Sequence, residues 1–189
     1  SGTIAGANVS NVAVVCTTNN YTVGGTVAGL AAGNNVVLRN NGGNNLTVAA
    51  NGAFTFSTAL PDQSAYAVTV FTQPTTPNQT CIVTNGSGNL AGANVSNVTV
   101  VCTTTTYTVG GTVAGLAAGN NVVLRNNGGN DLNVAANGAF TFTTAVADGA
   151  AFAVTVFTQP TTPSQTCVVT GGSGTIAGAN VSNVAVVCT

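Results

Sequence analysis

The five cysteines are the residues of this chain with the most definite chemistry. Cys16, Cys102 and Cys188 are spaced by 86 residues (102 − 16), and Cys81 and Cys167 by the same number. In one connectivity, Cys81 bonds Cys102 and Cys167 bonds Cys188. Cys16 is then left over, and its partner would lie in a neighbouring repeat or subunit. The other connectivity, Cys16–Cys81 with Cys102–Cys167, would tie each repeat to the one before and leave Cys188 free. Either connectivity indicates an oxidising, extracellular compartment.

Few other side chains can do chemistry, since the chain has no His, Lys or Glu and only 3% charged residues. Acid–base catalysis and hydroxyl activation both need a titratable base, so we expect no enzyme activity and no cofactor. Asp62 and Asp148 occupy equivalent turns before a strand, where an Asp usually bonds its own backbone. Asp131 stands alone, and neither the scattered Asp residues nor the widely spaced cysteines predict a metal site.

Composition excludes several classes of partner. The net charge is −1, and Arg39 and Arg125 are the only basic residues, too few to neutralise a nucleic-acid backbone. A hydrophobic fraction of 44% argues against disorder. The apolar residues occur in short bursts, which predicts no membrane insertion through a helix.

The chain repeats itself. The segment YTVGGTVAGLAAGNNVVLRNNGGN begins at Tyr21 and again at Tyr107, an offset of 86 residues (107 − 21). We therefore expect two domains, 18–103 and 104–189, which differ at 16 positions. Residues 1–17 are identical to 173–189. They are expected to be the C-terminal strand segment of a preceding repeat, or a strand intended for a neighbouring molecule.

Within a repeat the apolar residues alternate with polar ones, which is typical of half-buried strands. Alternate side chains, such as Val36 and Leu38, are expected to line one core. Seven strands are predicted, at Tyr21–Val27, Asn35–Arg39, Leu46–Ala49, Ala53–Phe56, Tyr66–Thr72, Thr80–Thr84 and Val95–Cys102. Asn51-Gly52 and Asn41-Gly42-Gly43 supply turn residues for hairpins. The pattern predicts an all-β chain of tandem Ig-like sandwiches with about seven strands each.

The motifs GTVAGLAAGNNVVL, LTVAANGAFTF and ADGAAFAVTV resemble the prealbumin-like β-sandwiches of bacterial surface proteins, the CnaB or carboxypeptidase-regulatory-like type. The resemblance covers about Tyr21–Thr72 and Tyr107–Thr158. It implies stalks, adhesins and extracellular fibres. Several CnaB-type domains carry a Lys–Asn isopeptide bond, and this chain lacks the Lys and the Glu for one; the resemblance therefore implies that a disulfide takes its place.

The period-two registers place Val37, Phe71, Ile82 and Val101 on outward faces, where they could pack against neighbouring molecules or be covered by the chain's own loops. The leading hypothesis is a repeat of an extracellular filament or surface fibre that assembles end to end with itself. The alternative is a stalk or ligand-binding module of an adhesin, with loops Ala31–Asn35 or Asn40–Asn45 recognising a glycan or protein. No Trp is available for a sugar platform.

Overall fold

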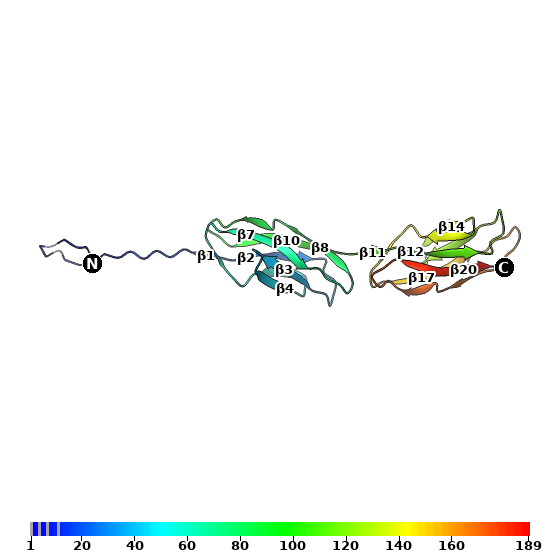
Figure 1. Ribbon diagram of the computed structural model, residues 1–189, viewed down its shortest axis with the longest axis horizontal. Helices are drawn as coiled ribbons and strands as arrows, with labels where there is room; N and C mark the ends of the chain where they lie inside the picture. Colours follow the sequence, from blue (N-terminus) through cyan, green and yellow to red (C-terminus); the bar gives the residue numbers. More distant parts are fainter. Residues whose placement is uncertain (1, 4, 7, 11) are drawn as a thin grey trace.

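The computed structural model of the chain describes residues 2–3, 5–6, 8–10 and 12–189. Two β-sandwiches follow one another along the long axis, and the first lies between the N-terminal segment and the second (Figure 1). Every regular element in the described residues is a strand, so the predicted all-β class of tandem sandwiches is confirmed. The expected strand segment 1–17 includes four positions outside this description, and its described residues form no strand.

Each sandwich contains ten strands, of which two are very short. In the first they are β1 (Asn20–Tyr21), β2 (Val23–Ala28), β3 (Val36–Asn40), β4 (Asn44–Val48), β5 (Gly52–Thr55), β6 (Leu60–Pro61), β7 (Ala65–Thr72), β8 (Gln79–Thr84), β9 (Ser87–Asn89) and β10 (Val95–Thr104). In the second they are β11 (Thr106–Tyr107), β12 (Val109–Ala114), β13 (Val122–Asn126), β14 (Asn130–Val134), β15 (Gly138–Thr141), β16 (Val146–Ala147), β17 (Ala151–Thr158), β18 (Cys167–Thr170), β19 (Ser173–Thr175) and β20 (Val181–Cys188).

Two four-stranded sheets face each other in each sandwich. The first has the strand orders β5-β2-β10-β8 and β4-β3-β7-β9, and the second repeats them as β15-β12-β20-β18 and β14-β13-β17-β19. The last long strand pairs in parallel with the first, β10 with β2 and β20 with β12, whereas the other pairs are antiparallel. Each sandwich is therefore closed by the strand that leads out of it.

The core lies between the two sheets, as the alternation of apolar residues requires. On β3, Val36 and Leu38 are fully buried, and Phe54 packs edge-to-face on Phe56 with ring centroids 5.9 Å apart. The second sandwich repeats this core, with Phe140 and Phe142 in the same arrangement. The two cores share no buried residue, so each sandwich has a complete core of its own.

One local prediction was wrong, and two short strands were not predicted. Asn51-Gly52 does not close a hairpin, because β4 and β5 belong to different sheets. The amide of Asn51 instead accepts a hydrogen bond from the Leu30 N–H and donates one to the Leu30 carbonyl, both at 2.8 Å. The strands β6 and β9 were not predicted. In the sequence β9 lies between the two cysteine strands and pairs with β7 in the other sheet, although β8 and β10 are neighbours in their own sheet.

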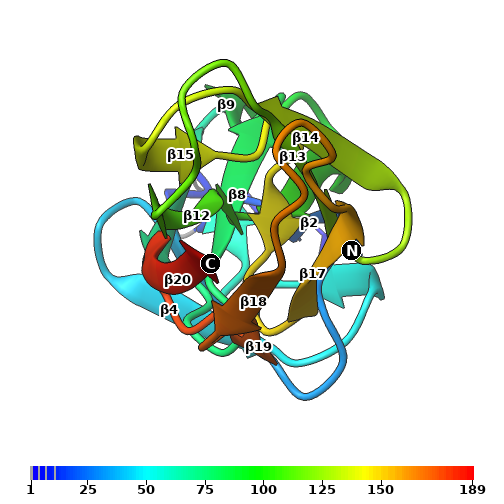
Figure 2. The ribbon, with the colours of Figure 1, turned by 90° about the vertical axis from the view of Figure 1, so that its right-hand side faces the viewer.

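The connection between the sandwiches is short. Strand β10 ends at Thr104 and β11 begins at Thr106, so Thr105 alone separates them. Strand β11 pairs with β16 of the second sandwich, as β1 pairs with β6 of the first. The view along the long axis, from the end of the second sandwich, shows that sandwich in front of the first (Figure 2).

Candidate functional site

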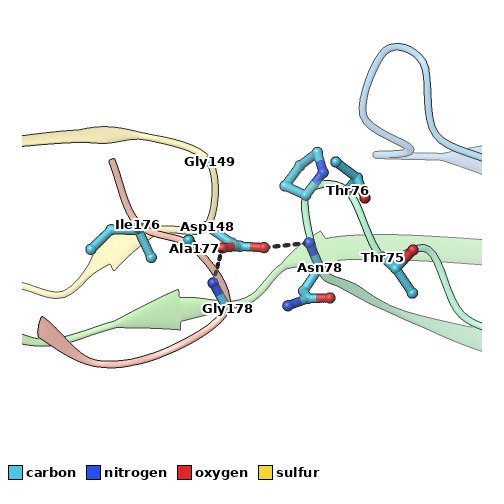
Figure 3. Close-up of a pocket in the computed structure, with 9 residues that line it drawn as sticks. Thr75, Thr76, Asn78, Asp148, Gly149, Ile176, Ala177 and Gly178 are labelled. Atoms are coloured by element: carbon cyan, nitrogen blue, oxygen red, sulfur yellow. Dashed lines mark hydrogen bonds between the residues drawn. The ribbon is translucent and has the colours of Figure 1, made fainter. Parts of the chain in front are cut away.

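The junction between the two sandwiches carries the densest set of contacts to a charged side chain. Asn78, at the end of the β7–β8 loop of the first sandwich, donates its backbone N–H to Asp148 Oδ2 at 2.6 Å. The Asn78 carbonyl accepts the N–H of Thr105 at 2.9 Å, and the Thr105 carbonyl accepts the N–H of Asp148 at 2.8 Å. The three residues form a closed ring that joins the first sandwich, the linker and the second sandwich. Figure 3 shows the bond between Asn78 and Asp148.

Asp148 is anchored within its own sandwich as well. Its Oδ1 accepts the N–H of Gly178 at 2.7 Å, and its residue surface is only 8% exposed. The backbone donors lower the pKa of the Asp148 carboxyl group, the Asn78 N–H most and the Gly178 N–H next, because they favour the charged form. The junction therefore contains a carboxylate that stays ionised at neutral pH.

The remaining junction contacts are apolar or weakly polar. Thr75, Pro77, Gly149 and Ile176 line an open hollow of about 400 Å³ around the ring. Asn78 Nδ2 lies 3.5 Å from the hydroxyl of Tyr107, at the limit of a hydrogen bond. The hollow is shallow, and its one charged group, the Asp148 carboxylate, already accepts hydrogen bonds from the protein. It therefore offers little to a small ligand, and its contacts connect the two sandwiches.

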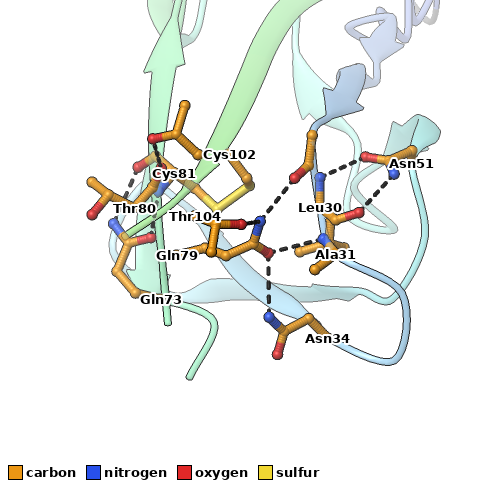
Figure 4. The surroundings of a disulfide bond; sticks show 12 residues. Leu30, Ala31, Asn34, Asn51, Gln73, Gln79, Thr80, Cys81, Cys102 and Thr104 are labelled. Carbon is orange, nitrogen blue, oxygen red and sulfur yellow. Dashed lines mark hydrogen bonds between the residues drawn. A yellow bond between two sulfur atoms is a disulfide. The ribbon is translucent and has the colours of Figure 1, made fainter. Parts of the chain in front are cut away.

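A second polar network surrounds Gln79, the residue that follows Asn78 and begins β8 (Figure 4). Gln79 Oε1 accepts the N–H of Ala31 at 2.9 Å and a hydrogen bond from Asn34 Nδ2 at 3.2 Å. Its Nε2 donates to the Gly29 carbonyl at 2.8 Å and to Thr104 Oγ1, on the outgoing strand, at 3.2 Å. This network holds the loop Ala31–Asn35, one of the two candidate binding loops, against its own sandwich.

The structure contains two disulfide bonds, Cys81–Cys102 and Cys167–Cys188, between directly paired residues of β8 with β10 and of β18 with β20. All four cysteines are buried. Each bond therefore fastens an edge strand to the strand that leads out of the sandwich. Cys16 is exposed and unpaired among the described residues.

Gln73 covers the outer edge of the disulfide-bearing strand. Its Oε1 accepts the N–H of Cys81 at 2.7 Å, and its Nε2 donates to the Cys81 carbonyl at 3.1 Å. Gln159 does the same for Cys167. The side-chain amide thus takes the place of a neighbouring strand at the edge of the sheet, where an unpaired backbone invites association.

The four residues predicted as an assembly surface fall on two separate sheets. Phe71, Ile82 and Val101 are exposed, whereas Val37 is half-buried. Ile82 and Val101 are direct cross-strand neighbours on β8 and β10. Phe71, on the other sheet, is covered in part by the Arg39 guanidinium, whose Cζ lies 3.4 Å from the ring centroid. They make two small apolar patches, and their part in assembly stays a prediction.

The second candidate binding loop, Asn40–Asn45, contains the tight turn between β3 and β4. Arg39 Nε donates to Asn45 Oδ1 at 2.8 Å. In the second sandwich Asp131 replaces that Asn and forms a two-pronged pair with Arg125 at 2.6 and 2.8 Å. The Arg125 hydrogen bond lowers the pKa of the Asp131 carboxyl group. Asp131 is exposed and Arg125 is half-buried. Among the described residues no three acidic or cysteine side chains gather in a group that could hold a metal ion.

Sequence reasoning missed the role of the junction. It expected Asp62 and Asp148 to bond their own turns, and the N–H groups of Gln63 and Gly149 do bond them. The structure gives Asp148 a further donor from a loop 70 residues earlier. One signal was available, since the Asp at this position occurs in both repeats of a chain that otherwise nearly avoids charge. Asn78 carried no signal, because its contribution is a backbone N–H.

Comparisons with known proteins leave the family open. No protein-family model matches the chain, and no curated protein does. Among solved structures, the major pilin protein T-13 of Streptococcus pyogenes aligns over 92% of this chain and 97% of its own, with 10% sequence identity and a TM-score of 0.25. A score that low carries no argument about fold or function. The described part of the chain has no helix that could cross a membrane.

Proposed function

We propose that this chain is a structural repeat of an extracellular filament or surface fibre, built by joining disulfide-stapled sandwiches end to end. The closed ring of Asn78, Thr105 and Asp148 is the observation that carries the proposal. A single-residue connection with hydrogen bonds on both sides suits a segment that keeps its two domains in line. A flexible linker would suit a module that searches for ligands.

The chemistry of the chain is consistent with a mechanical role. The four buried cysteines form two bonds that suit an oxidising exterior. A net charge of −1 leaves little electrostatic repulsion between copies. Only three carboxyl groups and two guanidinium groups are present as charged side chains, which favours a structural role over catalysis.

Residues 1–17 fit the same proposal as the closing strand of a sandwich in front of the first one. Val12 and Val14 are strongly exposed, whereas Val184 and Val186, at the same positions of the identical segment 173–189, are buried in the second core. A sandwich lacking its last strand, whether earlier in a longer chain or in another molecule, would bury these side chains and offer Cys16 a partner. Such a sandwich would be joined by strand addition, whereas a sandwich with its own closing strand, such as the second one, could be joined only through its end surface.

Electron microscopy of the native material tests the proposal, with an antibody raised against the chain used to label the images. We expect continuous label along extended fibres. If all disulfide bonds lie within repeats, as Cys81–Cys102 and Cys167–Cys188 do, the fibres should keep their length under reducing conditions. Fibres that break on reduction would place a disulfide between units. Label confined to globular particles or to fibre tips would contradict the proposal and favour the binding-module alternative.

A further inference from the structure

The first sandwich carries a copy of the Asp148 site at its opposite end. Asp62 is equivalent to Asp148 by the 86-residue offset (148 − 62). Its Oδ1 accepts the N–H of Gly92 at 2.8 Å, as Asp148 accepts that of Gly178. Its own N–H donates to the Asn19 carbonyl at 2.8 Å, as that of Asp148 donates to Thr105. The local half of the junction is therefore already built at Asp62.

The half that is missing at Asp62 is the donor from another sandwich. Among the described residues Asp62 Oδ2 accepts no hydrogen bond, although Asp148 Oδ2 accepts the Asn78 N–H. Asp62 is also only half-buried, whereas Asp148 is buried. The difference between these two aspartates within one molecule shows what docking of a second sandwich does to the site.

The second sandwich ends in a copy of the donor loop. Pro163 and Ser164 correspond to Pro77 and Asn78, and both are exposed, whereas Pro77 and Asn78 are half-buried at the junction. Gln165 makes the contacts of Gln79 to its own loop but lies half-buried, without the Thr104 bond that Gln79 has. The Pro163–Ser164 end of the second sandwich therefore exposes the surface whose equivalent, at Pro77 and Asn78 of the first sandwich, is partly buried against the second sandwich.

We propose that the Asp62 end of one molecule docks onto the Thr161–Ser164 loop of a second copy of this chain, with the Ser164 backbone N–H donating to Asp62 Oδ2. This inference rests on the proposed function and gives it a defined contact. The partner is argued from continuity with the internal junction, whose two halves recur at Asp62 and at Ser164. Residues 1–17 of the docking molecule then lie outside the partner's second sandwich, whose closing strand β20 is in place. The docked Asp62 carboxylate would become buried and accept a third backbone N–H, in addition to those of Gln63 and Gly92, as Asp148 does.

The residues that differ between the two sites are compatible with this docking. Ser164 replaces Asn78, but the donated group belongs to the backbone and is unchanged. Gln63 replaces Gly149, and a Cβ at Gly149 would lie 3.5 Å from Pro77 Cβ, an ordinary van der Waals contact. Gln63 has a φ of 68° where Gly149 has 77°, so the backbone already has the conformation of the docked site.

That Cβ separation supplies a direct test, because it matches the distance between the Cβ atoms of a disulfide. The variant combines Gln63→Cys with Pro163→Cys in a Cys16→Ser background, at low salt and under mild oxidation. If the ends dock as proposed, gel electrophoresis without reductant shows a ladder of covalent multimers that collapses to monomer on reduction. A matched control, Pro77→Cys with Gly149→Cys in the same background, closes the equivalent bond inside one molecule.

Adding Asp62→Ala to the cross-linking variant should slow ladder formation about tenfold, the effect of losing one hydrogen bond to a charged group. Asp131→Asn removes a carboxylate away from both ends and should leave the ladder unchanged. Thermal unfolding checks that each variant is folded. Monomers that persist while the internal control closes would overturn the docking contact. Labelled fibres in the native material would then still support the proposed function, so the two failures are distinguishable.

Discussion

At the scale of single residues, Asp148 makes the junction sensitive to acid. Backbone donors lower its pKa below the usual value of about 3.9. A carboxyl group whose pKa is depressed by docking stabilises the docked form above its ordinary pKa, and this stabilisation is lost as the pH falls through the lowered value. The sandwiches should therefore hold their relative orientation at neutral pH and loosen well below pH 4.

Small-angle X-ray scattering at pH 7 and at pH 2.5 measures this loosening. We expect the maximum dimension to vary with pH in the wild-type chain, and Asp148→Asn to remove most of that variation. Asp131→Asn is the matched control, since that carboxyl group also has a lowered pKa but pairs within its own sandwich. Equal pH responses in the two variants would show that the junction carboxylate is not the cause.

Gln73 protects an edge strand by satisfying both backbone groups of Cys81. Gln73→Leu removes both hydrogen bonds, and unfolding by denaturant should show a loss of about 1–3 kcal/mol for the first sandwich. The bare edge should also associate sideways with other molecules, which sedimentation velocity would detect. Ser57→Leu, at an exposed position between β5 and β6, is the control. A monomeric, fully stable Gln73→Leu protein would refute the edge-protection role.

The residue types predicted disulfide bonds, but they did not predict which contacts the carboxylates would make. The sequence left two connectivities open and favoured Cys81 with Cys102, because the two cysteines lie on consecutive predicted strands, and the structure joins them. It did not predict the contact between Asp148 and Asn78, because the donor is a backbone group and the two residues are 70 positions apart. Only a folded loop brings them together.

At the scale of elements, the parallel pairing of β2 with β10 depends on a glycine. A Cβ on Gly25 would lie only 1.8 Å from the Val98 carbonyl oxygen, so Gly25→Ala would force β2 and β10 apart. We expect the first sandwich to lose about 3 kcal/mol or more, as severe overpacking does. Gly43→Ala is the control, since its Cβ would meet open space. Thermal unfolding that is the same for both variants would contradict this close approach.

The disulfide fastens the same outgoing strand from its other side. Closing a 21-residue separation is expected to stabilise a sandwich by about 3 kcal/mol through the unfolded state. The double variant Cys81→Ser, Cys102→Ser should therefore unfold the first sandwich at lower denaturant, while the second keeps its midpoint. A single, unshifted transition would mean that packing alone holds β8 against β10.

The long strands were predictable from the period-two pattern, and all seven predicted segments overlap strands of the first sandwich. The short strands were not. Strand β9 reads Ser87-Gly88-Asn89, with every residue exposed, so no apolar pattern marks it. It forms because the Gly86 and Leu90 backbones on either side bond to the neighbouring strand region. Asn51-Gly52 resembled a hairpin turn because local sequence does not say which sheet the next strand joins.

At the scale of the whole molecule, the 86-residue repeat predicted two similar domains but did not predict how they are joined. The orientation depends on the one-residue linker and on the ring through Asp148, Asn78 and Thr105. The same surfaces recur at Asp62 and at Ser164. The proposed docking would extend the molecule by the contact that it already contains, as the proposed fibre requires.

Residual dipolar couplings of the two sandwiches, measured by NMR in one aligned sample at neutral pH, test the central claim of a fixed junction most directly. The account predicts that both sandwiches fit a single alignment tensor in the wild-type chain, and that Asp148→Ala separates them into two tensors while each sandwich keeps its fold. Two different tensors in the wild-type chain would contradict it, because the sandwiches would then move independently and the junction could not hold a rod.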